Sequence, residues 1–298
     1  METIIIENVS KSYGKTMAVD GLSLRVKEGE IYGFIGPNGA GKSTTIRMLL
    51  NFIKADYGNI KVLGFSPTKH GVEIKKNTGY VSADTFIYSD MKVKELFRFT
   101  ESFHKIDASK KTKQLTEILE IDIHKKFEQL SFGNRKKVAI ACALLHSPKL
   151  IILDEPSNGL DPVIRSNMYE LLKEEQKNGA TIFFSSHVLS EVQHFCTRIG
   201  LLKEGKLIKE TSAADFTNVG YLQVRIESKE AIDFSSLQGI AGLTLQDNVY
   251  HFIFSGNPND LIKKLSTANI DSLHISEPEL ENVFMHYFEK ESEVNHAV

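Results

Sequence analysis

Residues 36–44 have the types and spacing of a loop that binds phosphate. They read Gly-Pro-Asn-Gly-Ala-Gly-Lys-Ser-Thr and satisfy the pattern G-x-x-x-x-G-K-[ST]. The glycines permit a sharp turn that directs backbone N–H groups at an anion. Lys42 adds a positive charge for the β- and γ-phosphates, and the Ser43 hydroxyl can ligate Mg²⁺. A nucleoside-triphosphate site is therefore predicted, formed by Gly36, Asn38, Gly39, Ala40, Gly41, Lys42, Ser43 and Thr44.

A pair of carboxylates follows a second apolar run. Leu150–Leu153 leads directly into Asp154 and Glu155, and acids at the C-terminal end of a buried strand suit a phosphate site in an open α/β sheet. We expect Asp154 to complete the Mg²⁺ shell and Glu155 to polarise an attacking water.

The elements that would position these groups can be recognised from apolar periodicity. Residues 30–35 indicate a buried strand entering the phosphate loop, and Ile46, Leu49, Leu50 and Ile53 share one face of a helix after it. Strand, loop and helix in this order place the anion at a helix N-terminus.

Further strand-like runs at residues 79–82, 150–153, 181–185 and 199–202 predict an α/β fold with a largely parallel sheet. Residues 3–9 and 22–27 alternate as in an antiparallel β-subdomain. Residues 85–146 show helical patterns only and predict a helical insertion, with Phe97, Phe99 and Phe103 in its core. The basic run Arg135–Lys137 is expected to be a solvated face.

The periodicity changes near residue 210, so we predict a first domain over 1–210 and a small α+β domain over 211–298. In the second domain, residues 222–226, 249–254 and 272–275 read as strands, and 259–268 and 279–288 as helices. A ferredoxin-like arrangement would account for this order.

The composition is that of an ordinary globular protein. The 298 residues include 36 basic and 38 acidic side chains, so no basic surplus indicates a nucleic-acid partner. Cys142 and Cys196 lie in apolar surroundings and are expected to be reduced. No signal-peptide pattern opens the sequence, and the longest apolar run, 138–145, is too short to span a bilayer. We expect a cytoplasmic protein that reaches a membrane only through a partner.

Four short motifs occur in a distinctive order. Tyr13 precedes the phosphate loop, Leu130-Ser131-Phe132-Gly133-Asn134 precedes Asp154, and Asn158-Gly159-Leu160-Asp161 and His187 follow. Over residues 1–210 the chain resembles the nucleotide-binding subunit of ATP-binding-cassette (ABC) transporters. The resemblance implies a P-loop NTPase cassette that binds ATP and Mg²⁺. It matches residues 130–134 to the signature motif, residues 158–161 to the D-loop and His187 to the switch histidine.

The resemblance also implies roles for these residues. Two cassettes pair head to tail in this family, so Ser131, Gly133 and Asp161 would meet the nucleotide of the neighbouring cassette. Tyr13 would stack on adenine, and Glu155 and His187 would be catalytic. The stretch from Asp154 to Pro162 and residues 277–284 are similar to the branch of bacitracin-, lantibiotic- and amphipathic-peptide-exporter ATPases, including exporters of phenol-soluble modulins.

Two positions depart from the family pattern. Ala83 stands where a glutamine or glutamate is usual, and the neighbouring Asp84 is a candidate to supply the missing oxygen to the metal. Phe132 replaces the first glycine of the signature and is expected to limit the approach to a neighbouring nucleotide. A different cassette as partner would tolerate both changes most easily, and a homodimer is the alternative.

The predicted function is ATP hydrolysis that powers export through separate transmembrane permease subunits, at the inner face of the cell membrane. The alternatives are a soluble ABC ATPase that acts on ribosomes or DNA, and a non-hydrolysing module that dimerises with ATP. The intact Glu155 disfavours the last, and the sequence leaves the transported substrate open.

Overall fold

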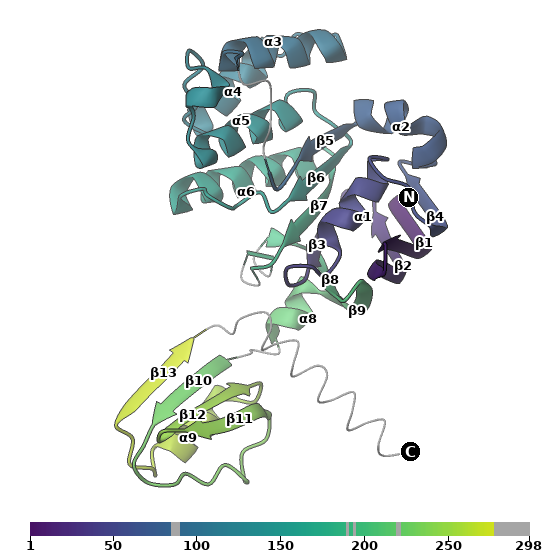
Figure 1. Ribbon diagram of the computed structural model, residues 1–298. Coiled ribbons are helices and arrows are strands. Elements are labelled where there is room, and N and C mark those ends of the chain that lie inside the picture. The colour runs from purple at the N-terminus through teal and green to yellow at the C-terminus, as the bar shows by residue number, and fades with distance from the viewer. Residues whose placement is uncertain (85–89, 189–190, 193–194, 219–221, 277–298) are drawn as a thin grey trace. The chain divides into compact units, whose positions relative to one another are not determined.

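The computed structural model describes residues 1–298 except 85–89, 189–190, 193–194, 219–221 and 277–298 (Figure 1). The chain divides into two compact units. The first comprises residues 1–187 and 195–210, and the second comprises residues 188–194 and 211–298. That residues 1–210 and 211–298 form two separate domains remains a prediction.

The first unit is built on a six-stranded sheet with the order β5-β6-β7-β3-β8-β9. Its strands are β3 (Ile31–Ile35), β5 (Thr78–Val81), β6 (Leu150–Asp154), β7 (Thr181–Ser186), β8 (Arg198–Lys203) and β9 (Lys206–Ser212). The pairs from β5 to β8 are parallel. Every residue of β3, β6 and β7 is buried, as expected for parallel strands covered on both faces. The predicted largely parallel sheet is confirmed.

A smaller antiparallel sheet with the order β2-β1-β4 lies in the same unit. It contains β1 (Glu2–Tyr13), β2 (Thr16–Lys27) and β4 (Tyr57–Val62). Its apolar face contributes Ile4, Ile6, Leu24 and Val62 to the main hydrophobic core, which also includes Ile46 and Leu49 of α1 (Lys42–Leu49). Helix α2 (Pro67–Lys76) connects this sheet to β5.

The segment between β5 and β6 is helical over its described residues. It contains α3 (Val93–His104), α4 (Ser109–Ile118), the short 3₁₀ helix η1 (Phe127–Gln129) and α5 (Phe132–Leu144), and α6 (Pro162–Lys177) follows β6. Phe97 is buried as predicted, but Phe99 and Phe103 are 51% and 62% exposed, so their expected core position is wrong. The reason is helical geometry, because position 99 lies about 200° around the helix from position 97.

The second unit contains α8 (Ala213–Asn218) and a sheet with the order β11-β12-β10-β13. Its elements are β10 (Leu222–Glu227), β11 (Ile240–Gln246), β12 (Val249–Phe254), α9 (Pro258–Leu265) and β13 (Ser272–Ser276). All three strand pairs are antiparallel, and α9 packs its Leu261 and Leu265 against a core that includes Phe252 and Phe254. Residues 228–239 connect β10 to β11 without a helix, whereas a ferredoxin-like fold has one there. The helix predicted over 279–288 lies outside the described residues.

In the described part of the chain, no helix combines the length and the apolar character needed to cross a membrane.

Candidate functional site

The predicted phosphate loop connects the end of β3 to the start of α1, so the expected strand–loop–helix order is present. Gly39 and Gly41 have φ values of 82° and 102°, which favour glycine. A Cβ atom at Gly41 would also lie 2.4 Å from the carbonyl oxygen of Ala18. No side chain caps the N-terminus of α1, so its first N–H groups remain available to an anion bound at the loop.

A cavity of about 500 Å³ opens above this loop. That volume is in the range of small-molecule sites, roughly 300–1,000 Å³. Its lining combines the loop with four distant segments: Tyr13, Ala18, Pro37, Asn38, Gly39, Ala40, Gly41, Lys42, Ser43, Thr44, Ala83, Glu155, Asn158 and His187. Most of the residues predicted for the nucleotide therefore gather around one cavity, while Gly36 and Asp154 are outside its lining.

Three ionisable side chains that could take part in catalysis meet in this cavity. The Nζ atom of Lys42 is 3.2 Å from Oε1 of Glu155, and Nδ1 of His187 is 2.7 Å from Oε2 of the same carboxylate. Lys42 also donates hydrogen bonds to the carbonyl oxygens of Gly36 and Pro37. Glu155 is 8% exposed and has a φ of 50°, the kind of unusual backbone conformation that concentrates at functional sites.

The neighbouring Asp154 has the properties of a metal ligand. Its carboxylate is buried at the end of β6, and Oδ1 accepts a hydrogen bond of 2.6 Å from the Ser185 hydroxyl. Within the described residues, no group of three or more histidine, cysteine or acidic side chains could hold a metal by itself. This donor set fits Mg²⁺, which proteins bind through one or two carboxylates together with substrate phosphates.

Tyr13 lies at the end of β1 and is 47% exposed at the cavity. The two residues before Tyr13 are bound to Asp56, which accepts hydrogen bonds from Lys11 Nζ at 2.6 Å and from the Ser12 N–H at 2.8 Å. These hydrogen bonds lower the pKa of Asp56 to about 2, and the bond from Lys11 has the largest effect.

Ser131, Gly133 and Asp161 are not part of the cavity lining. Ser131 caps α5 by accepting a hydrogen bond from the Asn134 N–H, and Asp161 caps α6 through the N–H groups of Val163 and Ile164. A Cβ atom at Gly133 would lie 2.3 Å from the carbonyl oxygen of Gly159, so the first turn of α5 fits closely against the 158–161 loop. Their role toward a neighbouring nucleotide stays a prediction.

The structure also describes the two positions that depart from the family pattern, Ala83 and Phe132. Ala83 lines the cavity, whereas Asp84 is exposed and is not among its lining residues. The ring of Phe132 is directed toward the chain's own loop, because a Cβ atom at Gly159 would lie 2.4 Å from Phe132 Cδ1.

Lys136 is the functional candidate that sequence reasoning missed. The solvated face expected for Arg135–Lys137 is wrong, because Lys136 is fully buried and Lys137 is 8% exposed. Burial lowers the pKa of Lys136, and the carboxylates of Asp154, Asp84 and Glu155 oppose this shift. A run of three basic residues gave no signal of this burial, which depends on the packing of α5 beside β5.

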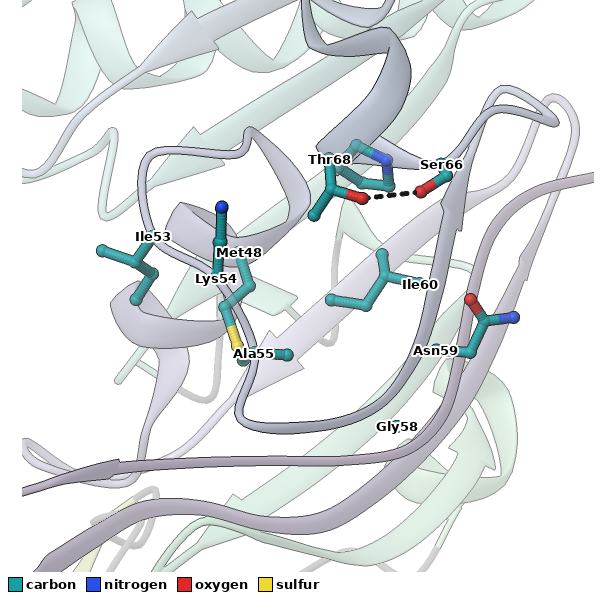
Figure 2. Close-up of a pocket in the computed structure, with 10 residues that line it drawn as sticks. Met48, Ile53, Lys54, Ala55, Gly58, Asn59, Ile60, Ser66 and Thr68 are labelled. Atoms are coloured by element: carbon teal, nitrogen blue, oxygen red, sulfur yellow. Dashed lines mark hydrogen bonds between the residues drawn. The ribbon is translucent and has the colours of Figure 1, made fainter.

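A second cavity, of about 120 Å³, lies between the end of α1, β4 and the start of α2. Figure 2 shows Ser66 and Thr68 joined by a hydrogen bond at its wall, with Met48 and Ile60 among the apolar lining residues. Lys54 is its only charged lining residue. The cavity therefore lacks the paired acid–base chemistry of the first.

Comparison with known proteins gives consistent matches. A family model described as ABC transporter matches residues 19–158. The chain is 40% identical over 217 residues to the bacitracin transport ATP-binding protein BcrA of Bacillus licheniformis, covering 70% of each chain. It is 30% identical over 298 residues to the linearmycin resistance ATP-binding protein LnrL of Bacillus subtilis, covering 94% of this chain and 96% of that protein.

Solved structures show the same fold. A dimeric ATP-binding cassette in a post-hydrolysis state with ADP and phosphate has a TM-score of 0.65 and 25% identity, covering 70% of this chain and 98% of that one. The cassette cbiO1 of Clostridium perfringens has a TM-score of 0.63 and 29% identity, covering 72% and 90%.

Proposed function

This chain belongs to the ABC transporter family as an ATP-binding subunit, an ATPase coupled to transport, and we propose that it powers the export of an antimicrobial or amphipathic compound. Separate transmembrane subunits would form the path. Similarity to a linearmycin resistance protein along 94% of the chain, and to a bacitracin transport protein over the cassette, supports this class of substrate.

The contact of Glu155 with both Lys42 and His187 in one cavity is the observation that carries the assignment of residues. Glu155 is the general base that accepts a proton from the attacking water, and the water oxygen then bonds to the γ-phosphorus as ADP leaves. His187 orients Glu155 and the water through its ring, while Lys42 neutralises phosphate charge.

Asp154 and the Ser43 hydroxyl would hold Mg²⁺, which would supply positive charge to offset that of the phosphates. The adenine would stack on Tyr13.

Cassettes of this family dimerise and work with transmembrane subunits. For this chain we favour a second, different cassette as partner, because Phe132 and Ala83 depart from the usual pattern. The chain would then be a peripheral subunit at the inner face of the membrane. Neither a ribosome- or DNA-directed role nor a non-hydrolysing role has a specific observation in its favour.

A paired substitution tests the proposal. Glu155→Gln keeps the shape of the side chain but removes its basicity, so ATP turnover should fall by ~10²–10⁴-fold while ATP still binds. Lys42→Ala should lose tight ATP binding altogether, as measured by calorimetry.

In cells that express the chain with its membrane subunits, Glu155→Gln should abolish resistance to a panel of membrane- and cell-wall-active antimicrobials, including bacitracin. Unchanged resistance would contradict the export proposal, and unchanged hydrolysis would contradict the role of Glu155.

A further inference from the structure

Lys136 is the most deeply buried charged side chain among the residues that the structure describes. It belongs to the second turn of α5, and its Nζ atom donates hydrogen bonds to the carbonyl oxygens of Ser82 at 2.9 Å and Ala83 at 2.7 Å. Burying an ammonium group without partners is costly. These two carbonyl bonds are therefore the local compensation that allows a lysine at this position.

The backbone held by Lys136 forms part of the nucleotide cavity. Ser82 and Ala83 directly follow β5, and Ala83 is in the cavity lining together with Glu155 and His187. The methyl group of Ala83 can make no hydrogen bond across the cavity. The position of this wall consequently depends on contacts to its backbone, and Lys136 supplies two of them.

The preceding, first turn of α5 contacts the loop at residues 158–161, which follows Glu155 in the sequence. Phe132 precedes Lys136 by four residues, and the Lys136 ammonium lies 5.7 Å from the centroid of the Phe132 ring. That ring lies against Gly159, and Gly133 fits against the carbonyl oxygen of the same residue. The first two turns of α5 thus connect the segment at residues 82–83 with the loop at residues 158–161.

We propose that Lys136 is a positioning residue for ATP hydrolysis, which holds the Ala83 wall of the cavity through its two carbonyl bonds. In this arrangement the hydrogen bonds from Lys136 hold the backbone at residues 82–83, because the methyl side chain of Ala83 cannot form a hydrogen bond that would do so. Phe132 links the preceding turn to Gly159, so both departures from the family pattern, Ala83 and Phe132, lie next to Lys136. This inference rests on the proposed function only for its kinetic test.

The experiment compares Lys136→Met with Lys136→Gln in the full chain with its partner subunits. Methionine fills the space without a donor, whereas the glutamine amide can still donate to a carbonyl. Lys136→Met should lower kcat by about tenfold or more and change the Kd for ATP by less than about threefold, because positioning affects the reacting geometry more than binding. Lys136→Gln should restore kcat to within about threefold of the wild type.

The matched control is Lys111→Met. Lys111 also makes hydrogen-bonded contacts, to Ser147 and Glu175 at 2.7 Å each, but does not line the cavity. The kcat of the Lys111→Met variant should differ from that of the wild type by less than about twofold.

Hydrogen exchange of the Ala83 and Asp84 amides gives a readout that does not require turnover. Lys136→Met should speed this exchange by about tenfold or more in the protein without nucleotide, and Lys136→Gln should not. Equal exchange and equal kcat in Lys136→Met and the wild type would overturn the inference, and so would an equal loss in the Gln and Met variants. A wild type that binds ATP but does not hydrolyse it would instead contradict the proposed function, and the exchange experiment would still decide the role of Lys136.

Discussion

Tyr13 lines the cavity with a ring that is not buried in a hydrophobic core. Its ring is half-exposed, and Lys11 lies over it at 5.9 Å from the centroid. Lys11 and Ser12 are both tied to the Asp56 carboxylate. An aromatic face oriented in this way can stack on a base without a specific hydrogen bond.

We therefore expect Tyr13→Ala to weaken ATP binding by ~1–3 kcal/mol, the range for a lost stacking contact. Tyr13→Phe retains the ring and should bind ATP within about twofold of the wild type. Calorimetric titration with ATP measures both variants. Equal weakening by both would show that the hydroxyl group, and not the ring, makes the contact.

Among the elements, the packing of α3 against the end of α5 contains a pair of histidines. The rings of His104 and His146 are stacked with centroids 3.8 Å apart. Burial first, then the charges of His104 and Lys111, lower the pKa of His146 to about 4. Burial lowers the pKa of His104 as well.

The direction of the pH effect follows from these shifts. In the unfolded chain His146 takes up a proton near its ordinary pKa of 6.5, whereas in the folded chain it does so only near pH 4. The unfolded state therefore binds more protons between these values, and stability should be lost as the pH falls through this window.

His146→Phe keeps an aromatic ring in the stack and removes the titration. Between pH 7 and pH 5, the melting temperature of the wild type should fall by several degrees more than that of the variant. Parallel pH profiles from thermal denaturation would contradict the assignment to His146.

Elements with continuous or regular apolar patterns were predictable, and those with little buried surface were not. Strands β3, β6 and β7 are buried along their whole length, and each contains a short run of large apolar residues. By contrast, β4 buries only Ile60 and Val62, and β11 buries only Ala241. Helix α2 buries only Pro67 and Ile74, so its period is too weak to read.

The site divides in the same way. The loop at 36–44, Glu155 and His187 meet because each follows a strand of one parallel sheet, a relation that sequence order predicts. Lys136 could not be predicted, because its neighbours in sequence are charged and its burial depends on α5 lying beside the end of β5.

For the whole molecule, we expect the two unusual positions, Ala83 and Phe132, to affect the state of association. Phe132 is half-exposed at the start of α5, within the motif that we predict to meet the nucleotide of a neighbouring cassette. If the usual partner is a different cassette, the purified Glu155→Gln chain should remain monomeric with ATP and Mg²⁺, although it cannot turn the nucleotide over.

Light scattering measures this directly, because a dimer has twice the 33.5 kDa mass of the chain. Addition of the second cassette should produce an ATP-dependent dimer and raise the ATPase activity of the wild type. A stable ATP-dependent dimer of the lone Glu155→Gln chain would favour the homodimer instead.

The position of the Phe132 ring also makes the molecule suited to optical measurement. The chain contains no tryptophan, so Phe132→Trp would introduce a single indole. Its fluorescence would be free of emission from other indoles. The indole would lie against Gly159, within the contact between α5 and the 158–161 loop, with one side open to solvent. Its emission wavelength and quenching would follow movements of that contact in real time, in a protein that carries no dye.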